Sequence, residues 1–126
     1  MNTTEEKNGS ISFANDVVAT IAGLATVEID GVAGMSGGFS GGLAELLGRK
    51  NLTKGVKVEV GQEECAIDLY IVADYGSDIP AMSKRIQSNV KKAVETMTGL
   101  RPVEINIHIQ GVHIKKDKPE DTTRVH

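Results

Sequence analysis

The spacing of hydrophobic residues along this chain alternates between the period of an α-helix and that of a β-strand. Apolar residues recur every three or four positions in two long segments, which predicts helices over about residues 15–28 and 78–98. Strict alternation of apolar and polar residues predicts strands elsewhere. The expected strands cover residues 11–13, 56–60, 67–73 and 103–110, and the second and third of them form an antiparallel hairpin.

The first predicted helix is apolar around nearly its whole circumference. A helix of this kind must be covered by more than one neighbour. We expect Gly23 to admit a second, closely packed helix, and Gly31 to adopt the left-handed conformation that ends a helix. Ser12 or Asn15 is the expected cap at its N-terminus.

The second predicted helix carries one apolar stripe, so one of its faces packs against the core while the other faces water. Asp78 is a suitable N-cap, Pro80 fits the first turn, and Gly99 follows the last helical residue. The stripe consists of Ile79, Met82, Ile86, Val90, Val94 and Met97.

The half-polar strands are typical of an open sheet that helices cover on one face, not of a doubly wound parallel sheet. We therefore predict a single two-layer α+β domain over residues 9–114, with a mostly antiparallel open sheet of four to five strands. Two long helices lie on one face, and one short helix at Leu43–Leu47 follows a glycine-rich loop. Residues 1–8 and 115–126 are polar without apolar periodicity, so we expect disordered tails there.

Six glycines occur in the twelve residues from Gly31 to Gly42. Glycine loses more backbone freedom on ordering than other residues, so such a segment requires positive φ angles or close approach to bare backbone. We interpret it as an exposed loop, in which Phe39 either fills the domain's own core or anchors a partner. The candidate partner-contact residues in this loop are Gly37, Gly38, Phe39, Ser40, Gly41 and Gly42.

Parts of this loop resemble two phosphate-binding motifs. Residues 42–50 differ from a P-loop in spacing, and Asn51 replaces its Ser or Thr, so we reject this interpretation. The pairs Gly34/Gly37 and Gly38/Gly41 have the GxxG spacing of a KH-like clamp on a nucleic-acid backbone. The formal net charge of -3 argues against broad affinity for nucleic acid, and a KH-like module remains only an alternative.

Four basic residues of the second helix, Lys84, Arg85, Lys91 and Lys92, repeat at seven-residue spacing and are expected near one solvent-exposed face. A solvated helix face explains them without any function. The functional alternative is a docking patch for an acidic partner or an anionic lipid surface, with an affinity that falls as salt rises. We keep these four as candidate partner-binding residues.

The chain contains no recognisable combination of catalytic residues. Cys65 is its only cysteine, which excludes an intrachain disulfide and a cysteine-rich zinc site, and we expect it to be a small buried residue. His108 and His113 are expected on different faces of a strand, without an evident third metal ligand. Asp68 and Asp74 are interpreted as strand-edge or capping residues. We predict no enzyme activity, no metal, no cofactor and no small-molecule substrate.

No segment has the apolar character of a secretory signal or the length of a membrane span. We therefore expect a cytoplasmic protein, and any association with a membrane would be peripheral or through a partner.

The chain resembles the alkaline-shock and general-stress proteins of Gram-positive bacteria in four segments, Ile11–Ala14, Ile21–Ala25, Glu28–Met35 and Val103–Val112, with a double-glycine loop before the last. The block Asp30–Met35 is the most specific of these, and the likeness covers about residues 9–114. The resemblance implies a cytoplasmic, non-enzymatic protein of the envelope stress response, which in some members self-associates and is held at the membrane through an integral membrane partner. Other members are linked to lipid or fatty-acid metabolism, which remains an alternative. Our leading hypothesis is a self-associating scaffold or adaptor.

Overall fold

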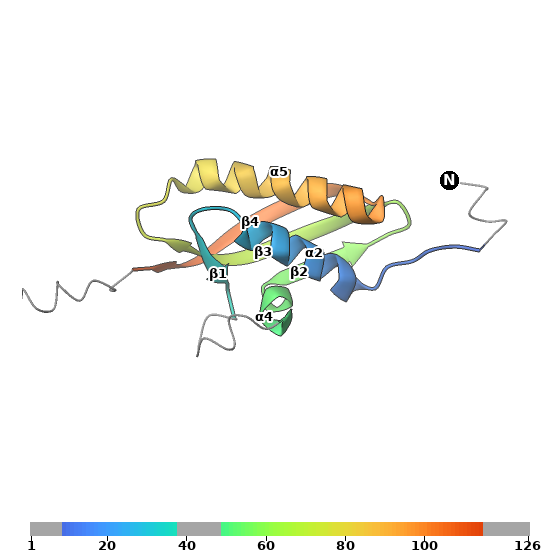
Figure 1. The fold of residues 1–126 in the computed structure, drawn as a ribbon, viewed down its shortest axis with the longest axis horizontal. Coiled ribbons are helices and arrows are strands. Elements are labelled where there is room, and N and C mark those ends of the chain that lie inside the picture. Colours follow the sequence, from blue (N-terminus) through green and yellow to red (C-terminus); the bar gives the residue numbers. More distant parts are fainter. Residues whose placement is uncertain (1–8, 38–48, 115–126) are drawn as a thin grey trace, which may run out of the picture.

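A computed structural model describes residues 9–37 and 49–114 and arranges them in one layer of helices and one of strands (Figure 1). The predicted α+β class, both long helices, the hairpin and the last strand are confirmed. The elements in chain order are α2 (Asn15–Val27), β1 (Val32–Met35), α4 (Arg49–Lys54), β2 (Val56–Val60), β3 (Glu64–Asp74), α5 (Ile79–Thr98) and β4 (Arg101–His113).

Strand β3 is the centre of the sheet and pairs with the other three described strands. β1 and β2 run antiparallel to β3 along one of its edges, whereas β4 runs parallel to it along the other. Two of the three pairings are thus antiparallel, as predicted for most of the sheet. β4 is parallel to β3 because the two strands are connected by α5, a crossover helix. The crossover returns the chain to the end of the sheet at which β3 begins.

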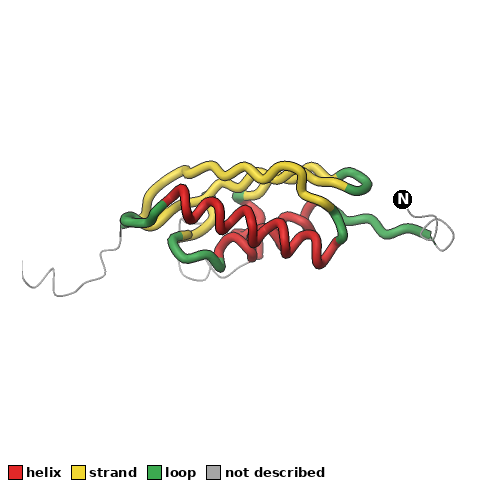
Figure 2. Tube along the Cα trace, turned by 90° about the horizontal axis from the view of Figure 1, so that it is seen from above, coloured by secondary structure: helices red, strands yellow, loops and turns green. Residues whose placement is uncertain are grey.

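All described helices lie on one face of the sheet, and no described element covers the other (Figure 2). The core lies between the layers, where alternate residues of β3 meet the apolar stripe of α5. Met97 is an exception to the predicted stripe, with 67% of its surface exposed, because Leu100 just after the helix fills this end of the core instead. The buried residues of the two elements are Cys65, Ile67, Leu69, Ile71 and Ala73 of β3 and Met82, Ile86, Val90 and Val94 of α5.

Both ends of α5 have the predicted chemistry. The Asp78 carboxylate accepts a hydrogen bond from the Ala81 backbone N–H at 3.2 Å, which satisfies one of the free donors of the first turn. Gly99 follows Thr98 with a φ of +79°, a left-handed conformation that costs glycine little. These two signals place the helix boundaries within a residue of the predicted ones.

Helix α2 is covered on several sides, as its apolar circumference predicts, because it packs against α5, α4, β1 and β2. The prediction that Gly23 admits a close second helix is also confirmed, since the Leu52 backbone of α4 lies against it. Gly31 has the expected positive φ, +102°, but it does not end the helix, because α2 ends at Val27 with Glu28 as its C-cap. It precedes β1 instead, so residues 32–35 of the segment interpreted as an exposed loop form a strand.

The start of the domain differs from the prediction. Residues 11–13 form no strand, and Ile11 is 74% exposed, because no other described strand lies alongside to pair with them. The N-cap of α2 is Ala14, without a side-chain hydrogen bond, so neither Ser12 nor Asn15 caps the helix. The predicted short helix at Leu43–Leu47 and the predicted tails at 1–8 and 115–126 lie outside the described residues.

Strands β1 and β2 follow one another along the same edge of β3 and point in the same direction. The Ser36 N–H at the end of β1 donates to the Tyr70 carbonyl at 2.8 Å, and the Tyr70 N–H donates to the Gly55 carbonyl at 2.7 Å. A Cβ at Gly55 would lie 2.6 Å from the Tyr70 oxygen, so only glycine fits this junction. β1 and β2 therefore act as one interrupted strand beside β3. Residues 37–54, called the excursion below, leave this strand after Ser36 and return to it at Gly55, both of which bond to Tyr70 of β3.

Candidate functional site

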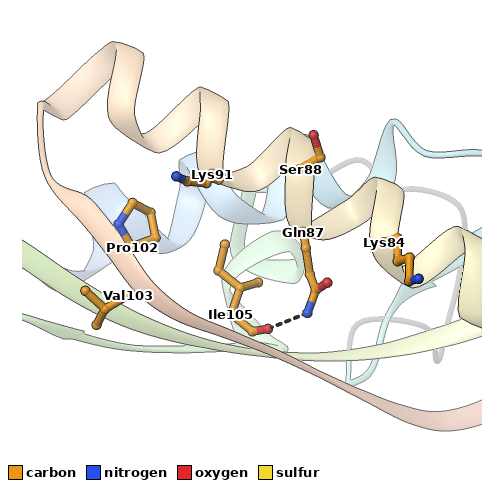
Figure 3. Close-up of a pocket in the computed structure, with 7 residues that line it drawn as sticks. All are labelled: Lys84, Gln87, Ser88, Lys91, Pro102, Val103 and Ile105. Carbon is orange, nitrogen blue, oxygen red and sulfur yellow. Dashed lines mark hydrogen bonds between the residues drawn. The ribbon is translucent and has the colours of Figure 1, made fainter.

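An open groove of about 430 Å³ lies between α5 and β4 (Figure 3). Figure 3 shows Lys84 at one end of the groove, Gln87 extending toward β4, and Lys91 further along the helix, with Pro102 and Val103 beyond it. The lining residues are Lys84, Gln87, Ser88 and Lys91 of α5 and Pro102, Val103 and Ile105 of β4.

The helical period explains why these four residues of α5 share the groove. Gln87, Ser88 and Lys91 follow Lys84 by three, four and seven positions, which places them on one helix face. The β4 side is apolar, and Val103 is 53% exposed there. The groove thus combines cationic side chains on the helix side with an apolar strand side.

One backbone group of β4 is already satisfied by a side chain of the groove. The Gln87 amide nitrogen donates a hydrogen bond to the Ile105 carbonyl oxygen at 3.0 Å (Figure 3). Within the described part of the sheet, β4 pairs with β3 alone, so its outer side is an edge. Native proteins often cover such edges with side chains, and Gln87 has this effect at Ile105.

The charge of the groove is only weakly compensated. The Lys91 ammonium lies 3.3 Å from a carboxylate oxygen of Glu95, one turn further along α5. The two side chains are 53% and 39% exposed, and ion pairs in such positions contribute little because water and salt screen them. Lys91 therefore remains available to another carboxylate.

The structure divides the four predicted basic residues into two pairs. All four are exposed, as predicted, but only Lys84 and Lys91 line the groove. Arg85 and Lys92 each follow one residue later, about 100° around the helix. Gln87 and Ser88 were not among the predicted site residues, although both lie between the two lysines in the sequence.

The uncovered face of the sheet carries a row of mutually paired side chains. Both the Asn106 amide and the His108 Nε2 lie 3.1 Å from Oδ1 of Asp68. The hydrogen bond with His108, followed by that with Asn106, lowers the pKa of Asp68. The Tyr70 ring stacks on His108 with 4.4 Å between ring centroids, and the Lys57 ammonium lies 5.6 Å from the centre of the Tyr70 ring.

The row joins side chains of β2, β3 and β4. These contacts explain why this sheet face is stable when it is exposed to water. Its polar groups hydrogen-bond to one another, and its aromatic rings stack on one another and so reduce their exposed surface. Asp68 is therefore a central hydrogen-bond acceptor, not the strand-edge or capping residue predicted.

The expectation that His108 and His113 lie on different faces is wrong. His108 pairs with Tyr70 and His113 with Asp74, and these two β3 residues point to the same face. A register shift after Ile71 inserts one extra β4 residue, so the two-residue alternation changes phase between the histidines. His113 Nδ1 lies 3.5 Å from Asp74 Oδ1. No group of three or more potential metal ligands occurs among the described residues.

Two other predicted features can be placed. Cys65 is buried, as predicted, and burial raises the pKa of its thiol, so it stays in the unreactive protonated form. Gly37 has a φ of +91° and follows β1, where a Cβ would lie 3.7 Å from Lys54 Cβ. The remaining loop residues of the predicted contact surface, Gly38, Phe39, Ser40, Gly41 and Gly42, lie outside the described residues.

The family model for the alkaline-shock proteins, a family with a cell envelope-related function, matches residues 3–114. The chain belongs to the alkaline-shock protein family. The resemblance to alkaline-shock and general-stress proteins is thereby confirmed. None of the described helices of this alkaline-shock family chain combines the length and apolar character needed to cross a bilayer.

Three curated relatives show how the chain compares with other proteins. It is 41% identical to the Bacillus subtilis protein YqhY over 104 residues, which are 82% of this chain and 77% of YqhY. It is 36% identical to B. subtilis YloU over 110 residues, 86% of this chain and 92% of YloU. A Streptococcus pyogenes stress response regulator gls24 homolog is 34% identical over 114 residues, 90% of this chain but only 64% of that protein. No solved structure matches the chain.

Proposed function

We propose that this alkaline-shock family chain is a non-enzymatic adaptor that acts in the envelope stress response by binding other proteins. The observation that carries the proposal is the groove beside β4, where Lys84 and Lys91 flank an apolar surface. The family's cell envelope-related function and the stress-regulator name of a relative support this context. The chain spans only 64% of that relative's length. A regulatory role for this chain, like the one in the relative's name, is therefore part of our proposal.

The polar chemistry of the described residues favours binding over catalysis. The Cys65 thiol is buried and its pKa is raised, whereas an activated nucleophile requires a lowered pKa or an adjacent base. Asp68 and His108 hydrogen-bond to each other, and the His108 ring is stacked on Tyr70. These groups contact one another on the sheet surface and do not line the groove beside β4.

The adaptor self-associates in our proposal and reaches the inner face of the membrane through an integral membrane partner. The second contact surface is the glycine-rich segment around Phe39. Both ends of the excursion that contains this segment are held at Tyr70 by backbone hydrogen bonds. We therefore expect substitutions in the glycine-rich segment to leave the strand pairing of the sheet intact.

Affinity capture tests the adaptor function with two variants of equal charge change. Lys84→Glu/Lys91→Glu reverses the groove lysines, whereas Arg85→Glu/Lys92→Glu reverses the neighbouring pair on the same helix. Tagged parent and variants are used to capture proteins from the soluble and membrane fractions, and the captured proteins are identified by mass spectrometry.

We expect the groove variant to lose specific partners that the parent and the control variant retain, because only the first pair lines the groove. Equal capture by all three proteins would contradict the proposed site. Turnover of a metabolite by the purified chain would contradict the non-enzymatic role.

A further inference from the structure

We propose that the groove binds an extended acidic segment of a partner protein, which pairs with the outer edge of β4 as an additional strand. This inference rests on the proposed adaptor function and specifies the chemistry of its partner.

The backbone of β4 supplies the first argument. β4 covers the 13 residues Arg101–His113 and pairs with β3 on one side, while no described strand lies on its other side. The Ile105 carbonyl accepts its hydrogen bond from Gln87 of α5. Backbone groups alternate in direction along a strand, so Ile107 presents its groups to the same side as Ile105. An extended peptide can pair with an edge of this kind.

The side chains beside this edge supply the second argument. Lys84 and Lys91 are two helical turns, or about 10.5 Å, apart along α5. Alternate side chains of an added strand point to the same face, about 7 Å apart, and the long lysine side chains can reach carboxylates with this spacing. The apolar strand side of the groove, which includes Val103, suits the aliphatic part of the same side chains.

Charge selects an acidic partner over a second copy of this chain. If two copies related by a two-fold axis paired through their β4 strands, Lys84 and Lys91 of one α5 helix would lie close to the same residues of the other. Like charges at such an interface are unfavourable, whereas carboxylates are complementary to both lysines.

Gln87 provides a specific signature of strand pairing. Its amide donates to the Ile105 carbonyl in the free protein, so it competes there with a backbone N–H of the added strand. Gln87→Ala removes this competitor without changing the charge. We expect it to strengthen binding about threefold, a change comparable to the net contribution of one hydrogen bond.

The test measures binding of labelled ten-residue peptides by fluorescence anisotropy. The first peptide alternates glutamate with valine, the second alternates lysine with valine, and the third has the first sequence with alternate backbone nitrogens methylated. We expect the first peptide to bind the parent at least tenfold more tightly than the other two. Lys84→Glu/Lys91→Glu should abolish this binding, Arg85→Glu/Lys92→Glu should retain most of it, and Gln87→Ala should strengthen it.

Three results would overturn the inference. Equal binding of the methylated and unmethylated acidic peptides would show charge attraction without strand pairing. Absence of binding by the acidic peptide would exclude this ligand chemistry. Binding to phosphatidylglycerol vesicles that depends on the groove lysines, with no peptide binding, would assign the groove to a lipid surface. If captured proteins still depend on Lys84 and Lys91 in these cases, the adaptor function stands and only the strand pairing fails.

Discussion

Gly23 of α2 lies directly against the backbone of Leu52 in α4, and a Cβ at position 23 would be 2.7 Å from the Leu52 carbonyl oxygen. No side chain can be accommodated at that distance unless the helices separate. The contact therefore joins the start of the domain to the end of the excursion between β1 and β2.

Gly23→Ala should destabilise the fold even though alanine favours helices by about 1 kcal/mol over glycine. The added Cβ meets backbone, which cannot rotate away as a side chain can, and overpacking of this kind costs about 1–3 kcal/mol. We expect urea unfolding to show a net loss in the free energy of unfolding. Gly61→Ala is the control, because its nearest contact is an ordinary 3.4 Å, and equal stability of parent and Gly23→Ala would disprove the close contact.

Asn89 of α5 connects the two long helices. Its amide nitrogen donates to the Ala25 carbonyl in the last turn of α2 at 2.8 Å and to the Glu28 carboxylate at 3.1 Å. Asn89→Ala should lower the free energy of unfolding by about 1–2 kcal/mol, since it leaves that carbonyl without this donor. Asn89→Asp has the same shape but adds repulsion from Glu28, so chemical denaturation should show a larger loss. If the aspartate variant is as stable as the parent, these hydrogen bonds do not stabilise the helix pair.

The low pKa of Asp68 makes part of the stability depend on pH. A carboxyl group whose pKa is lower in the folded state stabilises the fold above its unfolded pKa, and this contribution is lost as the pH falls through the folded value. The contribution of Asp68 should therefore be complete above about pH 5 and decline as the pH falls below the ordinary pKa of 3.8. Thermal unfolding between about pH 6 and pH 2.5 should show a smaller decrease for Asp68→Asn than for the parent.

His108→Phe separates the causes of that shift, because phenylalanine keeps a ring to stack on Tyr70 but donates no hydrogen bond to Asp68. Carboxyl titration followed by NMR should show the pKa of Asp68 rising toward 3.8 in this variant. An unchanged Asp68 titration would mean that His108 does not cause the shift.

Self-association through the glycine-rich segment predicts a change in oligomeric state. Phe39→Ala removes the proposed aromatic anchor and Gly38→Val adds bulk beside it, so both should shift analytical ultracentrifugation profiles toward the monomer. Circular dichroism should show that both variants remain folded. If both keep every oligomeric and partner interaction of the parent, this contact surface is wrong.

Local signals in the sequence predict most of the elements. Asp78 and Gly99 mark the ends of α5 through capping chemistry, and alternation identifies the buried face of β3. The phase change between His108 and His113 leaves a trace beyond the predicted end of the strand at residue 110, where the apolar positions move from 105, 107 and 109 to 112 and 114. The parallel placement of β4 depends instead on how α5 packs.

The candidate site was predictable only on its helix side. Lys84 and Lys91 follow from their spacing, whereas Val103 and Ile105 reach the groove through the crossover that brings β4 beneath α5. The hydrogen bond from Gln87 to Ile105 joins residues 18 positions apart, and no local pattern encodes it.

The meeting of Ser36 and Gly55 at Tyr70 gives the domain a natural insertion point. With both ends anchored at one residue, lengthening the connection ahead of α4 adds loop-closure entropy, which grows by about 0.6 kcal/mol for each doubling of length. Grafted epitopes or recognition sequences of varied size can therefore be carried there while the scaffold keeps its strand register.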